Sequence, residues 1–404
     1  MRRLILLWAL VCLTLVNSAL CHSWYIKADG TGDAPTIQAG LDSAATGDTV
    51  RVAPGVYSEP VQTTGEGPSM IVMKAGVSLL AEEDMYDTVL DAKGQGRVIL
   101  CDAGVGNTLI RGFRITGGVA DVHLHDFGGG IFCASSSPVV EQNWIIGNTA
   151  HSGGGIAALY DASPVIRWNL IESNSTLGAS GGGVICHYGG DTHIHDNVII
   201  GNFADHVGGG VFIYRDSRAT IERNWIEANE ATNQGGGIQG NLSEILVSHN
   251  TIVRNESTWG GGAHVGESGT ADFLSNSFVG NRASHGAGIA IVAVNTRPCT
   301  VAFNRNIVAS NTGTGIYYEG GVLTHECNDS WGNTEHDFLG LSPGPTDFSE
   351  DPRFCNPDAD DYTLQACSPC VEGYGCGQIG ASGVGCGPTQ SEPTTWGAIK
   401  SMYR

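Results

Sequence analysis

The sequence predicts an all-β solenoid, in which short parallel strands wind around one axis and each coil stacks on the coil before it. A glycine triplet recurs every 25 to 28 residues, asparagines recur in pairs five residues apart, and apolar residues hold fixed places between these marks. Only 15% of the 404 residues are charged, which is unfavourable for coiled coils and long helices. A repeat of this length is typical of a solenoid in which each repeat contributes one coil.

Glycine triplets mark the start of a strand in each predicted coil. With the residue that follows, they are Gly128–Ile131, Gly153–Ile156, Gly181–Val184, Gly208–Val211, Gly235–Ile238, Gly260–Ala263 and Gly286–Ile289, the last with an alanine in the middle. Because glycine has no Cβ, we expect the triplets to let a turn enter the strand without a clash.

Asparagine pairs mark two bends of each coil. They are Asn143/Asn148, Asn169/Asn174, Asn197/Asn202, Asn224/Asn229, Asn250/Asn255, Asn276/Asn281, Asn306/Asn311 and Asn328/Asn333. In the first seven pairs one apolar residue lies between the two asparagines and another lies three residues before the first, as with Ile145 and Val140. This spacing predicts three short strands per coil with inward apolar side chains. Asparagine tolerates the left-handed conformation of sharp bends, and stacked amides can hydrogen-bond along the coil axis.

The first segments of the chain predict export and an N-terminal cap. Residues 1–21 begin with two arginines, continue as an apolar run and end on Ala19-Leu20-Cys21, which is typical of a secretory signal peptide. An uncleaved anchor is the alternative, and we expect no membrane span after this segment. Residues 22–60 are predicted to form a cap, with a short amphipathic helix from Thr36 to Ala45, because the first coil of a solenoid otherwise exposes an apolar face.

The remaining segments are predicted to be coils over residues 61–336, a closing segment over 337–387, and a linker with a short tail over 388–404. Six cysteines gather near this end: Cys327, Cys355, Cys367, Cys370, Cys376 and Cys386. In an exported chain they predict a segment held by disulfides whose pairing stays open, and a metal site is the alternative. The chain is therefore expected to be secreted or held at the cell surface.

The repeated Gly-Gly-Gly-Ile and Ile/Phe-x-x-Asn units over residues 24–336 resemble the right-handed parallel β-helix of the pectin-lyase-like superfamily. They are also similar to the repeats of bacterial polymorphic outer-membrane adhesins, and Asp29 to Glu59 looks like the N-terminal cap of pectinesterases. The resemblance implies a right-handed parallel β-helix with an N-terminal helix cap and a Cys-rich C-terminal cap. The catalytic motifs of the enzymes with this fold have no match here, so no catalytic residue is carried over.

The charge balance limits the classes of partner. The formal net charge is −21, from 20 Lys and Arg against 41 Asp and Glu. This excludes nucleic acid as a partner, because binding to phosphate needs clustered basic residues. Neutral glycans remain compatible, and so does Ca²⁺ at acidic turns such as Asp358 to Asp361. We expect a monomer that contacts a polysaccharide.

An elongated carbohydrate-contacting face is predicted beside the glycine triplets. If the residue after each triplet points inward, the next one points outward. The outward side chains predicted to bind substrate are Phe132, Phe212, Gln239, Asn241, His264, Tyr317 and Glu319. Aromatic rings stack on the apolar faces of sugars, while amides, imidazoles and carboxylates bond to hydroxyl groups. The alternative is a face that loops cover.

The middle coils carry the densest polar cluster. The candidate catalytic residues are His187, Asp191, Tyr214, Arg215 and Asp216, and Tyr160, Asp161, Tyr188 and Arg218 lie near them. This set would place acids, bases and a cation within reach of one sugar unit. The alternative is a solvated loop edge.

A metal site is a further hypothesis on these coils. His193 and His195 are two residues apart on one predicted strand, so they face the same side, and Glu222 is expected beside His195 on the next coil. Two imidazoles and a carboxylate form a plausible Zn²⁺ set.

Three functions follow. The first is an exported binding or cell-surface protein with a carbohydrate-contacting face. The second is a polysaccharide lyase or glycoside hydrolase that acts on the middle coils, and the third is a purely structural surface protein. A new absorbance of unsaturated uronates on any polyuronate would separate the lyase from the other two.

Overall fold

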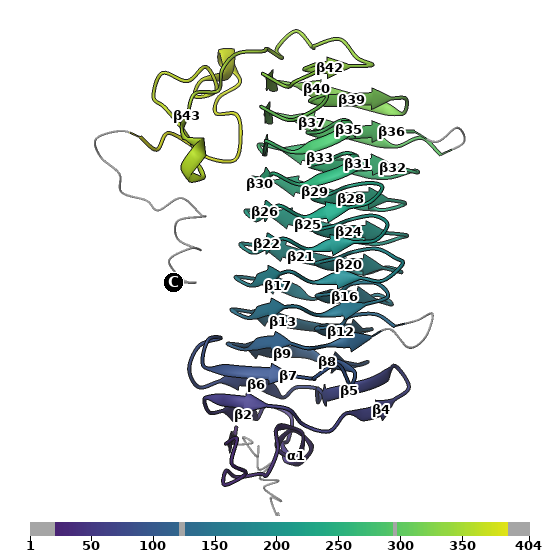
Figure 1. The fold of residues 1–404 in the computed structure, drawn as a ribbon, viewed down its shortest axis with the longest axis vertical. Helices are drawn as coiled ribbons and strands as arrows, with labels where there is room; N and C mark the ends of the chain where they lie inside the picture. Colours follow the sequence, from purple (N-terminus) through teal and green to yellow (C-terminus); the bar gives the residue numbers. More distant parts are fainter. Residues whose placement is uncertain (1–20, 121–125, 294–296, 387–404) are drawn as a thin grey trace, which may run out of the picture.

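The computed structural model describes residues 21–120, 126–293 and 297–386 (Figure 1). Its described strands form four sheets of 12, 11, 7 and 12 strands along one column and a separate two-stranded sheet, and nearly all strands of the column pair in parallel, which confirms the all-β solenoid. The predicted signal peptide, apart from Cys21, and the predicted tail over 388–404 lie outside the described residues.

Two of the four sheets flank the first asparagine of each coil. Sheet A comprises β1 (Ser23–Ile26), β2 (Thr49–Val52), β6 (Ser78–Ala81), β9 (Gly106–Arg111), β13 (Ser137–Glu141), β17 (Val165–Arg167), β21 (Asp191–His195), β25 (Arg218–Glu222), β29 (Glu244–Ser248), β33 (Thr270–Leu274), β37 (Thr300–Asn304) and β40 (Val322–Glu326). Sheet B comprises β3 (Gly55–Tyr57), β7 (Thr88–Asp91), β10 (Arg114–Thr116), β14 (Trp144–Ile146), β18 (Leu170–Glu172), β22 (Val198–Ile200), β26 (Trp225–Glu227), β30 (Thr251–Val253), β34 (Ser277–Val279), β38 (Ile307–Ala309) and β41 (Asp329–Trp331).

The other two sheets flank the glycine triplets. Sheet C comprises β4 (Gln62–Thr64), β5 (Gly67–Val72), β8 (Arg97–Cys101), β12 (Ile131–Ala134), β16 (Ile156–Leu159), β20 (Val184–His187), β24 (Val211–Tyr214), β28 (Ile238–Asn241), β32 (Ala263–Gly266), β36 (Ile289–Val292), β39 (Ile316–Glu319) and β42 (Phe338–Leu339). Sheet D comprises β11 (Val119–Ala120), β15 (Thr149–Ala150), β19 (Ser175–Thr176), β23 (Phe203–Ala204), β27 (Glu230–Ala231), β31 (Glu256–Trp259) and β35 (Arg282–His285).

Sheet D corrects the expectation of three strands per coil. Its strands follow the second asparagine of each pair directly, as Thr149–Ala150 follow Asn148. Five of the seven have only two residues, which is too short for an alternating pattern to appear in the sequence.

The core follows the predicted periodicity. The apolar residues between paired asparagines are all buried: Ile145, Ile171, Ile199, Ile226, Ile252, Phe278 and Val308. The apolar residues that lie three positions before the first asparagine of each pair are buried too: Val140, Ile166, Ile194, Ile221, Val247, Phe273 and Phe303. Both sets belong to one continuous apolar cluster that runs through the column, so each coil buries its apolar face only by stacking on its neighbours.

The paired asparagines form two buried ladders. Each Nδ2 donates a hydrogen bond to Oδ1 of the asparagine one coil later, over 2.9 to 3.2 Å along both ladders. The first ladder starts at Asn143 and ends on the carboxylate of Asp347. The second starts at Asn148 and ends on Asp337. The predicted stacking of amides is confirmed.

The left-handed bends lie one residue earlier than predicted. Among the described residues none of the ladder asparagines has a positive φ, whereas the residue before each first asparagine does, as with Trp168 at 53° and Asp196 at 54°. The bend at the preceding residue turns the chain, and the asparagine that follows it points into the column, where its amide is buried.

A helix at the N-terminal end and a disulfide-held segment at the C-terminal end flank the column. At the N-terminal end α1 (Ile37–Ser43) begins after Thr36, whose hydroxyl accepts a hydrogen bond from the N–H of Ala39. Its Ile37 and Leu41 are buried in the core cluster, so the helix covers the first coils.

At the other end a cap of residues 347–386 holds β43 (Phe354–Asn356), η1 (Pro357–Ala359), β44 (Asp361–Leu364) and η2 (Gly373–Gly375). It lies beside the later coils (Figure 1), where the N–H of Ala381 donates to Oγ of Ser277. Disulfides join Cys327 to Cys376 and Cys355 to Cys386, which confirms the disulfide-held segment. A metal site that uses Cys376 and Cys386 is excluded, because both sulfurs are in disulfides.

Candidate functional site

Five side chains from three consecutive coils meet where the strands of sheet C end. His187 and Tyr214 are the last residues of β20 and β24 and lie in register on adjacent strands. Tyr160, Tyr188 and Arg215 begin the turns that follow, with φ of 61°, 62° and 39°. These left-handed turns place their side chains beside the strand ends. We name these five residues the aromatic patch.

The rings of the aromatic patch stack on one another across the coils. The Tyr160 and Tyr188 rings are nearly parallel, with centroids 5.8 Å apart and an interplanar angle of 8°. His187 stacks on Tyr188 at 3.6 Å and lies 4.8 Å from Tyr214. The Arg215 guanidinium lies 5.6 Å from the ring centroids of both Tyr188 and Tyr214. Tyr160 and Tyr188 remain 37% and 40% exposed, so the stack ends in an apolar surface that is open to solvent.

The imidazole of His187 is half-buried in this stack. Burial, and then the positive charge of Arg215, lower the pKa of His187 to about 4, so the ring is neutral at neutral pH. Its Nε2 is buried and has no hydrogen-bond partner. In this conformation Nε2 therefore lies out of reach of a bound sugar, and only a movement of the ring would allow proton transfer there.

The two candidate carboxylates lie on exposed turns beside the aromatic patch. Asp191 begins β21, and its N–H donates to Oγ of Ser163 at 2.9 Å. Asp216 follows Arg215, and its N–H donates to the carbonyl of Leu242 at 2.8 Å. The predicted catalytic set is thus brought onto adjacent coils, and its catalytic role stays a prediction.

The structure corrects the exposure of the predicted carbohydrate-contacting face. Five of its seven side chains are buried: Phe132, Phe212, Gln239, Asn241 and His264. They do point outward, but the start of each glycine triplet folds back over them. A Cβ on Gly208 would lie 2.5 Å from Cβ of Phe212, and Phe127 packs on Phe132 with ring centroids 6.0 Å apart.

The other two side chains of that face, Tyr317 and Glu319, are accessible and belong to a second aromatic cluster. The rings of Trp259 and His285 stack with centroids 3.9 Å apart at an angle of 10°. The Tyr317 ring lies 5.7 Å from Trp259, and its hydroxyl donates to Oε2 of Glu319 at 3.0 Å. Sequence reasoning missed Trp259 and His285, although both precede a glycine triplet on adjacent coils and lie in register.

His264 is expected to make the stability of the column depend on pH. Its Nδ1 lies 3.0 Å from Nε2 of Gln239, and burial lowers its pKa to about 3. An unfolded histidine has a pKa of about 6.5, so between these values the unfolded chain binds a proton that the folded chain does not. The free energy of unfolding should therefore fall as the pH is lowered from about 6.5 to 4.

Urea unfolding at pH 7 and pH 4.5 checks this expectation. In His264→Gln the loss of stability between the two pH values should be smaller than in the wild type, because the titrating ring is gone. His249→Gln is the matched control, because His249 is exposed. An equal pH dependence in wild type and His264→Gln would contradict the assignment.

The predicted zinc set is an ion-pair network. Glu222 lies in register with His195, as expected, but its Oε1 is 2.8 Å from Nε2 of His193 and its Oε2 is 2.9 Å from Nη1 of Arg223. Nδ1 of His195 lies 2.7 Å from Asp196. Over residues 21–120, 126–293 and 297–386, no group of three or more His, Cys, Asp or Glu is arranged to hold a metal ion. In this structure Glu222 pairs with both His193 and Arg223, and a zinc site at His193, His195 and Glu222 stays a prediction.

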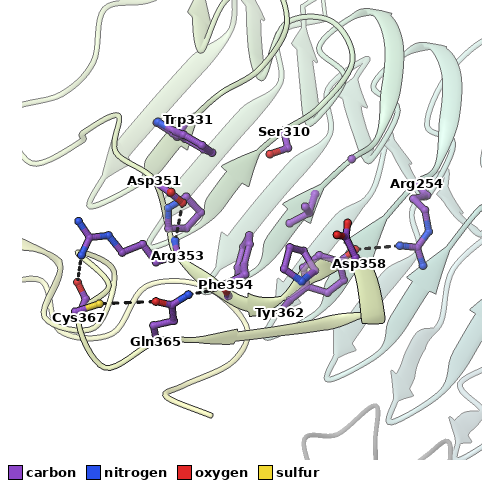
Figure 2. A pocket seen from close by; sticks show the side chains of 14 residues that line it. Arg254, Ser310, Trp331, Asp351, Arg353, Phe354, Asp358, Tyr362, Gln365 and Cys367 are labelled. Atoms are coloured by element: carbon purple, nitrogen blue, oxygen red, sulfur yellow. Dashed lines mark hydrogen bonds between the residues drawn. The ribbon is translucent and has the colours of Figure 1, made fainter. Parts of the chain in front are cut away.

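A groove of about 800 Å³ between the cap and the outer face of sheet B was not predicted (Figure 2). Its wall includes Arg254, Trp331, Phe354, Tyr362 and Cys367. Nη1 of Arg254 donates to the hydroxyl of Tyr362 at 3.0 Å and joins two residues 108 positions apart. No local pattern signals such a pair, because only the folding back of the cap brings them together. We name this feature the cap groove.

Comparisons with known proteins agree with the fold. The model of the right handed beta helix region family matches residues 103–278 and 182–331. No curated protein matches the chain significantly. In the part of the chain that the structure describes, no helix is long and apolar enough to cross a membrane.

Solved structures with a similar fold are 14% identical to this chain. Pectate lyase Pel9A has a TM-score of 0.48, with 87% of this chain and 91% of that chain covered. The Azotobacter vinelandii mannuronan C-5 epimerase AlgE6 A-module has a TM-score of 0.44, with 78% and 93% covered. The catalytic unit of the GH87 alpha-1,3-glucanase from Streptomyces thermodiastaticus has 0.41, with 78% and 67% covered. At this identity the likeness concerns the fold alone.

Proposed function

The chain belongs to the right handed beta helix region family, and on this scaffold we propose that it is an exported protein that binds a neutral polysaccharide on its aromatic patch. The observation that carries the proposal is the stack of rings that crosses three coils and ends in the exposed tyrosines Tyr160 and Tyr188. The apolar faces of sugar rings pack on such tyrosines, and Arg215 supplies donors to the hydroxyl groups.

The charges of the chain favour a neutral polysaccharide. The net charge of −21 repels an acidic polymer at low salt, and Arg215 is the one cation that lies over the rings of the described aromatic patch. Hydroxyl groups need hydrogen bonds but no charge compensation, so a neutral polymer avoids this repulsion. Export is supported by the two cap disulfides, because disulfides persist in oxidising compartments.

Binding without cleavage is supported by the burial of one ring nitrogen of His187, Nε2. A general base must come within hydrogen-bond reach of the proton that it removes, so Nε2 of His187 could act only after the ring moves, whereas the exposed carboxylates of Asp191 and Asp216 belong to the lyase or hydrolase alternative. The exposed tyrosines, in contrast, need no rearrangement before they contact a sugar.

Tyr188→Ala is expected to weaken the binding of a neutral polysaccharide about tenfold, because it removes the central exposed ring of the stack. The polysaccharide is chosen from those retained on a glycan array, and affinity is measured by isothermal titration calorimetry. Tyr188→Phe should bind like the wild type, since it keeps the ring. Tyr25→Ala is the control, because Tyr25 is also exposed but lies on β1 at the far end of the column.

Two results would contradict this proposal. Equal affinity of Tyr188→Ala and the wild type would remove the aromatic patch from the binding site. New absorbance of unsaturated uronates on incubation with polyuronates would instead support the lyase alternative.

A further inference from the structure

Two of the five cap cysteines remain thiols, and one of them lines the cap groove. Cys367 and Cys370 are separated by Ser368 and Pro369, and neither is in a disulfide. We propose that Cys367 and Cys370 form a redox-active dithiol, which exchanges with a peptide or small-molecule disulfide held in the cap groove. The inference concerns the cap alone and does not depend on polysaccharide binding.

The two thiols differ in exposure in the way that dithiol exchange requires. Cys367 is exposed on the wall of the cap groove (Figure 2), whereas Cys370 is fully buried. Two intervening residues are the spacing at which neighbouring cysteines close a reversible disulfide. An incoming disulfide can therefore reach Cys367 first, and Cys370 can act only on the intermediate that Cys367 has formed.

A buried carboxyl group lies against the inner thiol. Sγ of Cys370 donates to Oδ2 of Asp329 at 3.1 Å, and Oδ1 of Asp329 accepts a hydrogen bond from the N–H of Glu350 at 3.0 Å. Asp329 is fully buried, and burial raises its pKa to about 7. Burial, and then the charge of Asp329, raise the pKa of Cys370, so we expect the thiol to stay protonated until it attacks, with Asp329 as the group placed to accept its proton.

The surroundings of Cys367 suit a bound disulfide. Nη1 of Arg353 donates to the backbone carbonyl of Cys367 at 3.0 Å, and Sγ of Cys367 donates to Oε1 of Gln365 at 3.8 Å (Figure 2). The thiolate is the form of a cysteine that attacks a disulfide. Phe354 and Trp331 line the same cap groove and provide apolar surface for the substituents of a disulfide.

The exchange proceeds in two balanced steps. The Cys367 thiolate attacks one sulfur of the bound disulfide, which forms a mixed disulfide and releases the other sulfur as a thiolate. Asp329 then accepts the proton of Cys370, whose thiolate attacks Sγ of Cys367, closes the Cys367–Cys370 disulfide and releases the second thiolate. The dithiol loses two electrons, the substrate disulfide gains them, and the reverse sequence restores the dithiol.

Glutathione buffers of graded composition test the exchange on the full chain. After alkylation, peptide mass mapping follows each cysteine separately. We expect Cys367 and Cys370 to convert together between dithiol and mutual disulfide, while Cys327–Cys376 and Cys355–Cys386 stay closed. Opening of Cys367–Cys370 only under conditions that also open the other two disulfides would overturn the proposal, and so would a disulfide between either thiol and another cysteine.

Variants separate the roles of the three groups. With oxidised glutathione, Cys370→Ser should accumulate a glutathione adduct on Cys367, and Cys367→Ser should form none. In Asp329→Asn the Cys367–Cys370 disulfide should close about tenfold more slowly than in the wild type, while the same adduct forms on Cys367. Glu372→Gln is the control, because Glu372 is exposed two residues after Cys370. Persistence of the Cys367 adduct in the wild type would overturn the inference, because Cys370 would then not act on it.

Discussion

Replacing Asn250 with leucine is expected to lower the free energy of unfolding by about 3–5 kcal/mol. Oδ1 of Asn250 accepts hydrogen bonds from both the backbone N–H and Nδ2 of Asn224, and its Nδ2 donates to the carbonyl of Ile221 and to Asn276. Leucine is of similar size but leaves these buried donors and acceptors without partners, which costs more than the loss of the bonds themselves.

Urea unfolding followed by circular dichroism measures this effect. Asn233→Leu is the matched control, because Asn233 lies on a turn outside both ladders and its amide contacts His206 at the surface. Its unfolding midpoint should stay near that of the wild type. Equal midpoints for Asn250→Leu and Asn233→Leu would show that the ladders do not stabilise the column.

Gly209→Ala is expected to destabilise the column by about 3 kcal/mol or more, although it adds a single methyl group. A Cβ on Gly209 would lie 2.5 Å from the carbonyl oxygen of Gly236 on the next coil, and still closer to that of Glu230. Both are backbone atoms that are fixed by interstrand hydrogen bonds, so the coils must move apart to admit the methyl group.

Gly65→Ala is the matched control for this substitution. A Cβ on Gly65 would meet no atom within 4 Å, and Gly65 has no positive φ, so the change should be close to neutral. The same urea unfolding measurement applies. Equal midpoints for the two variants would contradict the view that the second glycine of each triplet is required by the close approach of neighbouring coils.

The fold could be predicted because its determinants repeat. Inward residues such as Ile145 recur at a fixed distance from the asparagines, and each repeat adds independent support for the same register. The two-residue strands of sheet D could not be predicted, because nothing alternates over two residues. The bends were placed one residue late. Each asparagine is required for the hydrogen bonds of its side-chain amide, whereas the left-handed backbone conformation belongs to the residue before it.

The candidate site could be predicted only where it depends on neighbouring coils. Stacking of the coils places His187 beside Tyr214, and the repeat predicted that contact. Burial of Phe132 and Phe212 depends on which segment folds over the outer face of sheet C, and periodicity carries no such information. The cap groove joins Arg254 to Tyr362, and that pairing depends on where the cap lies.

The carboxylates at the ends of the ladders give the column a finite length. Every amide in a ladder both accepts and donates, so each coil presents a donor to the next and could in principle recruit another copy of the chain. The carboxylates of Asp347 and Asp337 accept hydrogen bonds from the last amide of each ladder. A carboxylate has no N–H and therefore donates no further hydrogen bond. A second molecule that approached this end would therefore find no side-chain donor with which to continue either ladder.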